Sequence, residues 1–221
     1  MKAILFDLDN TLIDFIRMKR QSCDAAVSAM ISSGLKTGKA EAERLLFELY
    51  DRYGIEYNLI FQELLKRIGR KVDYRILANG IVAYRKAQAG LVTPYPNVVK
   101  TLLRLKERGL KLAIVTDAPR LKAWLRLVEM RLDDFFDEVI CFEDTGEHKP
   151  SAKPFMLALK RLHIKPHDAM FVGDWPERDV KGARALGIRT IFAEYGYTKK
   201  TKPRIKADHT IKSFEEILEY I

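Results

Sequence analysis

The chain has 221 residues, of which 48% are apolar, so it can form one large domain or a domain with a smaller module. Its net charge of +9 fits a solvated basic surface, steering of an anionic small molecule or weak contact with nucleic acid. No apolar run approaches the roughly 20 residues of a membrane span, and the distant Cys23 and Cys141 exclude a disulfide framework and a cysteine metal site.

The first predicted element is a buried strand at residues 3–6, which is followed at once by Asp7 and Asp9. Because the chain starts with a strand, we expect no signal peptide, and two separate cysteines favour a cytoplasmic location. Two carboxylates this close resist ionising together and usually reduce stability. The rest of the chain should therefore supply a group that compensates them.

Residues 15–92 contain no convincing strand. Apolar side chains recur there at three- and four-residue spacing, which predicts about four amphipathic helices separated by glycines. This stretch also holds fourteen basic and eight acidic residues, so it carries most of the positive excess. We predict an inserted helical cap at 15–92 and a core made of residues 1–14 and 93–221.

From residue 93 onward, predicted helices and apolar strands alternate. Helices are expected near 96–109, 120–130, 154–162, 176–186 and 213–220, and strands near 110–116, 138–142, 168–175 and 188–193. Continuous apolar strands separated by helices indicate a parallel sheet that is covered on both faces. The predicted fold is therefore α/β, a Rossmann-like doubly wound parallel sheet with an inserted all-helical module.

Polar side chains stand at the ends of three predicted strands. These are Asp7 and Asp9, Thr116, and Asp174 with Asp179 five residues later. Ligands of open parallel sheets bind beyond the carboxyl ends of the strands, so these groups should converge if the strands are neighbours. Four carboxylates together require a cation, and a small set of hard oxygen ligands suits Mg²⁺ with a phosphate as a further ligand.

Four motifs in order make the chain similar to a known family. DLDNT at 7–11 matches DxDxT, Thr116 ends the second motif, Lys149 lies in HKPSAKPF, and GDWPERD at 173–179 matches GDxxxxD. In these motifs the sequence resembles the haloacid dehalogenase superfamily, and within it the phosphatases that carry a helical cap after the first motif. The resemblance covers nearly the whole chain.

The resemblance implies a role for each motif residue. Asp7 would attack phosphorus to form an aspartyl-phosphate. Asp9 would protonate the leaving oxygen and then deprotonate the attacking water. Thr116 would donate a hydrogen bond to the transferring phosphoryl group, and Lys149 would offset its negative charge.

The resemblance also implies the metal site. Mg²⁺ would be held by Asp7, Asp174 and the backbone carbonyl of Asp9. Asp179 would be a supporting residue that orients Lys149 or a metal-bound water. Its alternative role is that of an ordinary acidic residue at a helix N-terminus.

Two of the other assignments have alternatives as well. Lys153 is also followed by proline, but Phe155 lies six residues after Lys149 and so favours Lys149. Thr116 could instead cap the helix that is predicted near Arg120.

The chain departs from the family pattern at four positions: Asn10, Asp117, Ala152 and Trp175. Asp117 stands where many relatives carry asparagine, and it could point away from the phosphate or cap a helix. None of the four removes a proposed catalytic group, but they leave the substrate open.

We predict a Mg²⁺-dependent phosphatase acting on a small phosphorylated metabolite. The alternatives are a phosphomutase of the same superfamily and a non-enzymatic phospho-acceptor domain. A haloacid dehalogenase is disfavoured, because a halide leaving group needs no proton from Asp9. We expect no membrane association and no specific nucleic-acid partner, and the sequence predicts no oligomeric state.

Overall fold

The computed structural model describes residues 1–199 and 201–221. The chain divides into two compact units, one made of Met1–Phe15 with Val92–Ile221 and the other of Ile16–Leu91. They are called the core unit and the helical unit below, and each is described by itself.

The core unit is built on a six-stranded sheet in the order β3-β2-β1-β4-β5-β6, in which every pairing is parallel. Its strands are short and largely apolar: β1 (Ala3–Phe6), β2 (Lys111–Val115), β3 (Glu138–Ile140), β4 (Ala169–Gly173), β5 (Arg189–Ala193) and β6 (His209–Ile211). Every residue of β1 and β4 is buried, as expected for central strands of a covered parallel sheet. The predicted fold class is confirmed.

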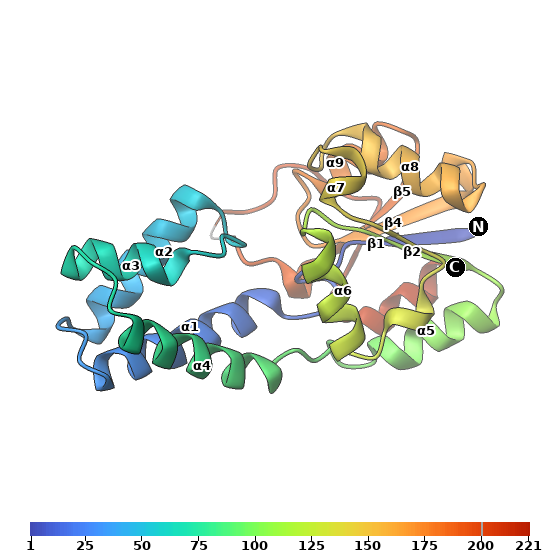
Figure 1. The fold of residues 1–221 in the computed structure, drawn as a ribbon. Helices are drawn as coiled ribbons and strands as arrows, with labels where there is room; N and C mark the ends of the chain where they lie inside the picture. Colours follow the sequence, from blue (N-terminus) through green and yellow to red (C-terminus); the bar gives the residue numbers. More distant parts are fainter. Residues whose placement is uncertain (200) are drawn as a thin grey trace. The chain divides into compact units, whose positions relative to one another are not determined.

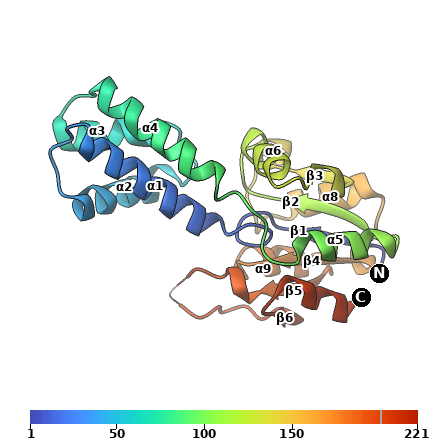
Figure 2. The same cartoon turned by 90° about the horizontal axis from the view of Figure 1, so that it is seen from below.

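Helices cover both faces of this sheet (Figures 1 and 2). They are α5 (Val98–Glu107), α6 (Arg120–Glu129), α7 (Phe142–Thr145), α8 (Ala152–Leu162) and α9 (Asp179–Arg184), with the 3-10 helices η1 (Asp133–Phe135), η2 (Pro166–Asp168), η3 (Glu194–Gly196) and η4 (Phe214–Tyr220). Side chains alternate between the faces: Phe171 packs edge-on against Phe155 of α8, while Phe6 packs against Phe214 of η4. The core unit therefore has an apolar layer on each side of the sheet.

The register of the central strands determines which loops meet. Phe6 pairs with Ile114 of β2 on one side and with Val172 of β4 on the other. The residues that follow these three strands therefore emerge side by side at one edge of the sheet. From β1 the chain builds β2 and β3 on one side, and it then crosses to build β4, β5 and β6 on the other side of β1. The place where the strand order reverses is the switch point at which open α/β sheets bind ligands.

Two predicted helices differ from the structure, and one strand was not predicted. The helix predicted over 176–186 begins only at Asp179, because residues 175–178 form a turn in which Asp179 N–H donates to the carbonyl of Trp175. Residues 214–220 form a 3-10 helix and not an α-helix. Strand β6 was not predicted, because its short polar sequence lacks an apolar run.

The helical unit consists of four helices: α1 (Phe15–Ser32), α2 (Lys39–Tyr53), α3 (Ile60–Gly69) and α4 (Tyr74–Ala89). All four contribute to its apolar core, which includes Ala26, Val27, Met30, Leu46, Tyr50, Ile60, Leu64, Leu65, Ile76 and Leu77. Helix α4 comes so close to α1 that a Cβ on Gly80 would lie 2.1 Å from the Met30 side chain. Within the described residues, no helix combines the length and apolar character needed to cross a membrane.

Candidate active site

Asp7 directly follows β1, at the carboxyl edge of the sheet. Its backbone N–H donates to the carbonyl of Val172 at 2.9 Å, which extends the β1–β4 pairing by one residue. The side chain is buried, and its Oδ1 lies 2.8 Å from Nζ of Lys149. A carboxylate that points out of a parallel sheet beside an ammonium group is well placed to meet an anionic substrate.

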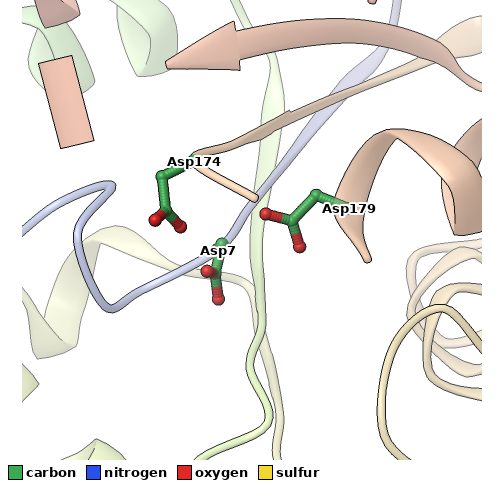
Figure 3. Close-up of side chains that lie close together, drawn as sticks. All are labelled: Asp7, Asp174 and Asp179. Carbon is green, nitrogen blue, oxygen red and sulfur yellow. The ribbon is translucent and has the colours of Figure 1, made fainter. Parts of the chain in front are cut away.

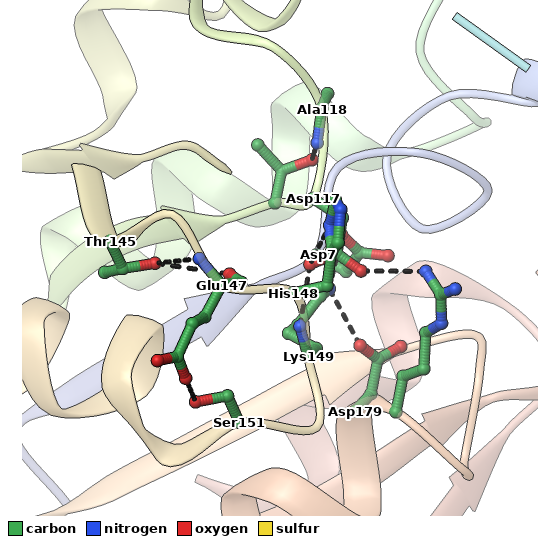
Figure 4. Close-up of polar contacts among 11 residues, drawn as sticks. Asp7, Asp117, Ala118, Thr145, Glu147, His148, Lys149, Ser151 and Asp179 are labelled. Carbon is green, nitrogen blue, oxygen red and sulfur yellow. Dashed lines mark hydrogen bonds and ion pairs between the residues drawn. The ribbon is translucent and has the colours of Figure 1, made fainter. Parts of the chain in front are cut away.

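Lys149 links two of the predicted carboxylates. Its Nζ lies 2.8 Å from Asp7 Oδ1 and 2.8 Å from Asp179 Oδ1, and its side chain is only 3% exposed (Figure 4). Burial alone would lower the pKa of Lys149, but Asp179, Asp7 and Asp117 raise it above its ordinary value. Lys149 therefore stays charged in the buried cluster.

The rival lysine lies elsewhere. Lys153 is in the first turn of α8, where its ammonium pairs with Glu147 and its side chain is 59% exposed. Lys149 thus belongs to the acidic cluster, and Lys153 belongs to the surface.

Asp179 is held beneath the end of β4. Its Oδ2 accepts a hydrogen bond from the backbone N–H of Trp175 at 2.9 Å. A Cβ at Gly173 would lie 2.3 Å from that same oxygen, so the site requires a glycine there. Burial raises the pKa of Asp179 to about 6, and Lys149 opposes this rise.

Asp174 completes a group of three buried carboxylates. One oxygen each from Asp7, Asp174 and Asp179 lies within 4.8 Å of the others (Figure 3). Among the described residues, no basic side chain forms an ion pair with Asp174. Burial, followed by the charges of Asp7 and Asp179, raises the pKa of Asp174 well above its ordinary value.

These residues fit a divalent metal ion. When ionised, the three carboxylates exceed the single charge of Lys149, so the buried cluster is short of positive charge. Its donors are hard oxygens, which suit Mg²⁺. The donor set and the charge imbalance are both compatible with the predicted metal.

Thr116 directly follows β2, whose Ile114 pairs with Phe6, the residue before Asp7. Its backbone N–H donates to the carbonyl of Ile140, and its Oγ1 accepts from the N–H of Ala118 at 3.1 Å. The hydroxyl thus makes a local turn and does not cap α6, whose N-cap is Pro119. The hydroxyl accepts this hydrogen bond through a lone pair, so its proton can still be donated to an incoming group.

Asp9 lies in the loop that follows β1. Asn10 adopts a left-handed conformation with φ of 59°, which asparagine tolerates better than most residues and which explains its place in a position where glycine is frequent. Oδ2 of Asp9 lies 2.9 Å from Nη1 of Arg126, which comes from α6. Asp9 therefore has a cationic partner that differs from the one shared by Asp7 and Asp179.

The structure shows how the acidic Asp117 is accommodated. Its Oδ1 accepts from the backbone N–H of Lys149 at 2.8 Å, and its Oδ2 lies 2.9 Å from Nη1 of Arg178. It neither points away nor caps a helix: it fixes the backbone that carries Lys149, and Arg178 balances its charge. The Arg178 guanidinium in turn lies 4.1 Å from the ring centroid of Trp175.

Sequence analysis did not identify Arg126 and Arg178 as neighbours of the site. Arg126 lies outside the four motifs, in a chain with 39 lysines and arginines. The only signal for Arg126 was its place among apolar residues in a predicted helix. Arg178 lies inside GDWPERD at a position where the motif specifies no residue type.

Known proteins are similar to this chain in sequence and in fold. A family model described as haloacid dehalogenase-like hydrolase matches residues 4–193. A glyceraldehyde 3-phosphate phosphatase of Methanocaldococcus jannaschii is 35% identical, over 100% of this chain and 97% of the relative. Phosphoglycolate phosphatase 1 of Pseudomonas aeruginosa is 32% identical over 89% of this chain and 70% of the relative.

Among solved structures, an HAD phosphatase from Thermococcus onnurineus superposes with a TM-score of 0.74 at 28% identity, over 100% of this chain and 97% of that one. The sequence motifs, the parallel sheet and these similarities all indicate the same family. The chain belongs to the haloacid dehalogenase-like hydrolases.

Proposed function

We propose that this hydrolase is a Mg²⁺-dependent phosphatase that cleaves small phosphate monoesters through an aspartyl-phosphate. The observation that carries the proposal is the buried cluster in which Lys149 bridges Asp7 and Asp179 beside Asp174. The relatives that are phosphatases support the same enzyme class, a phosphoric monoester hydrolase.

In the first step, a carboxylate oxygen of Asp7 attacks phosphorus and the bond to the leaving oxygen breaks. Asp9 gives its proton to that oxygen, so the alcohol leaves neutral and Asp9 becomes a carboxylate. At 4 Å, an unscreened pair of like charges repels by about 4 kcal/mol at an effective dielectric near 20. The Lys149 ammonium and the Thr116 hydroxyl reduce this repulsion by binding the phosphoryl oxygens.

In the second step, Asp9 removes a proton from a water molecule as that water attacks the phosphorus. The bond between Asp7 and phosphorus breaks, inorganic phosphate forms, and Asp9 is again protonated. Acid and base assistance of this kind contributes roughly 10²- to 10⁴-fold to the rate. The same carboxyl group thus serves both half-reactions.

Asp7, Asp174 and the Asp9 carbonyl would hold the Mg²⁺. When bound, the ion would neutralise charge on the phosphoryl group and keep it in line with Asp7. Asp179, which contacts Lys149 and the N–H of Trp175, acts as a support.

The relatives narrow the substrate class. Glyceraldehyde 3-phosphate and phosphoglycolate, which the names of two relatives specify, are small monoesters with an alkyl leaving oxygen. We infer that this chain acts on a similar metabolite. A leaving alkoxide of this type needs a proton, which is consistent with an acid at position 9.

The helical unit, residues 16–91, would be the cap that excludes water from the reacting phosphate. We expect the enzyme in the cytoplasm, where its two buried thiols, Cys23 and Cys141, would remain reduced.

The test is release of inorganic phosphate from a panel of phosphorylated metabolites that includes both of these esters. We expect activity with Mg²⁺, none in EDTA, and none for Asp7→Asn. Inorganic phosphate indicates a phosphatase, whereas an isomeric sugar phosphate without free phosphate indicates the phosphomutase alternative. Full activity of Asp7→Asn would contradict the proposed nucleophile.

A further inference from the structure

Helix α6 carries a buried arginine directed at the first motif. The side chain of Arg126 is only 6% exposed, and its Nη1 lies 2.9 Å from Oδ2 of Asp9. Its guanidinium carbon also lies 4.5 Å from the ring centroid of Phe15. One side chain thus contacts both ends of the segment from Asp9 to Phe15, and all three residues belong to the core unit.

The set of side chains that α6 buries includes an unexpected charged residue. It buries Arg126 together with the apolar Ala123 and Leu127. Three larger apolar residues of α6 stay outside: Leu121, Leu125 and Val128 are 71%, 57% and 56% exposed. Burial of arginine is costly unless the charge is paired, and burial of leucine is favourable. Hydrophobic burial explains why Leu127 is buried but not why an arginine is buried beside it while two leucines stay exposed, so the contact of Arg126 calls for a role beyond packing.

We propose that Arg126 is a positioning residue for the proton transfers of Asp9. This inference rests on the proposed function, because it assumes that Asp9 is the acid and base. Arg126 donates to Oδ2 of Asp9, and a carboxyl group that carries its proton on Oδ1 can keep accepting this hydrogen bond. The neutral carboxyl group still accepts from Arg126 through Oδ2, and the contact can persist in both half-reactions.

The chemistry of arginine suits this task. Its planar guanidinium stays charged and fixes a carboxylate by directed hydrogen bonds, and here the Phe15 ring supports its face. Lys149 cannot replace it, because its Nζ is already shared by Asp7 and Asp179. The site thus uses one cation for the nucleophile and another for the proton carrier.

The role predicts a dependence on the leaving group. An alkyl oxygen must be protonated as it departs, whereas p-nitrophenolate is stable without a proton. The ratio kcat/KM reports on steps up to the departure of the leaving group. Loss of Arg126 should therefore lower kcat/KM for an alkyl phosphate far more than for p-nitrophenyl phosphate.

The experiment measures kcat and kcat/KM of Arg126→Met, Arg126→Lys and wild type with p-nitrophenyl phosphate and with glyceraldehyde 3-phosphate. We expect Arg126→Met to lose roughly 10- to 100-fold in kcat/KM for the alkyl ester and less than about 5-fold for the aryl ester. Lysine should restore part of the alkyl activity. The methionine side chain keeps apolar contact with Phe15. If Arg126→Met does not fold, Arg126→Gln is measured in its place.

The matched control is Arg120→Met, the same change at the exposed start of α6, where Arg120 pairs with Asp144. It should leave the ratio of the two activities unchanged. If Arg126→Met loses both activities by the same factor, or loses neither, the positioning role is wrong while the proposed function stands. If wild type hydrolyses neither ester, the proposed function itself fails.

Discussion

Gly173 decides where Asp179 can lie. The hydrogen atom of glycine leaves room for the Asp179 carboxylate under the end of β4, where it receives the Trp175 N–H and contacts Lys149. Lys149 is in turn held through its backbone by Asp117. At the scale of single residues, hydrogen bonds from backbone N–H groups to carboxylates hold the charged side chains of the site in place.

We predict that Gly173→Ala displaces Asp179. Its Cβ would lie 2.3 Å from Asp179 Oδ2, so the carboxylate must move and its contact with Lys149 is weakened. Overpacking of this kind costs about 1–3 kcal/mol in the free energy of unfolding. Urea titration should show this loss, and phosphate release should fall with it.

The control for this variant is Gly69→Ala, because nothing lies within 4 Å of a Cβ built at Gly69. That change should leave both measurements near wild type. Unchanged stability and unchanged turnover of Gly173→Ala would show that Asp179 has no such requirement.

At the scale of elements, the loops that follow β1 and β5 support each other. A Cβ on Gly196, the last residue of η3, would lie 1.7 Å from the carbonyl oxygen of Asn10. The hydroxyl of Tyr195 donates to the carbonyl of Thr11 at 2.7 Å. The loop that carries Asp9 is thus packed against a segment 184 residues away in the sequence.

We predict that Gly196→Ala pushes these two loops apart. The clash involves backbone atoms, which cannot rotate away as the end of a side chain can. We expect kcat to fall about 10-fold or more, because small displacements of reacting groups are costly. Steady-state kinetics test this, and Tyr195→Phe, which removes only the hydrogen bond, should have a smaller effect. Wild-type kcat for Gly196→Ala would contradict it.

The sequence predicted the elements whose local signals were strong. The apolar runs of β1, β2 and β4, each followed by a motif residue, were sufficient to predict a parallel sheet. The start of α9 was predicted too early, since the turn that follows Asp174 depends on Asp179 contacting Trp175 N–H and Lys149. The inward orientation of Arg126 could not be predicted, because α6 buries this charged residue beside Leu127 while Leu121 and Leu125 stay exposed.

At the scale of the whole molecule, the proposed metal site predicts that Mg²⁺ binding and stability are coupled. Asp174 is buried beside Asp7 and Asp179, and its raised pKa shows that ionisation is unfavourable there without another cation. A ligand that binds only the folded state stabilises it by RT ln(1 + [L]/Kd), which is about 2.7 kcal/mol at 100 times Kd. Mg²⁺ should therefore raise the melting temperature.

We predict that Asp174→Asn is more stable than wild type without Mg²⁺ and less stable with it. In EDTA the variant should be more stable than wild type by about 1 kcal/mol, because one of three neighbouring buried charges is gone. With saturating Mg²⁺ it should be the less stable protein. Thermal unfolding with and without Mg²⁺ measures this, and Asp51→Asn, at an exposed position of α2, is the control. Equal stabilisation of both proteins by Mg²⁺ would place the metal elsewhere.

The central claim is that the Asp7 carboxylate forms a bond to phosphorus. Asp9→Asn should react with p-nitrophenyl phosphate, whose leaving group needs no proton, and then stall because no base activates the water. The most direct measurement is mass spectrometry of peptides from this variant after rapid acid quenching. One added phosphoryl group on Asp7 is the predicted result. A phosphoryl group on another residue would contradict the account, as would released phosphate without any phosphorylated peptide.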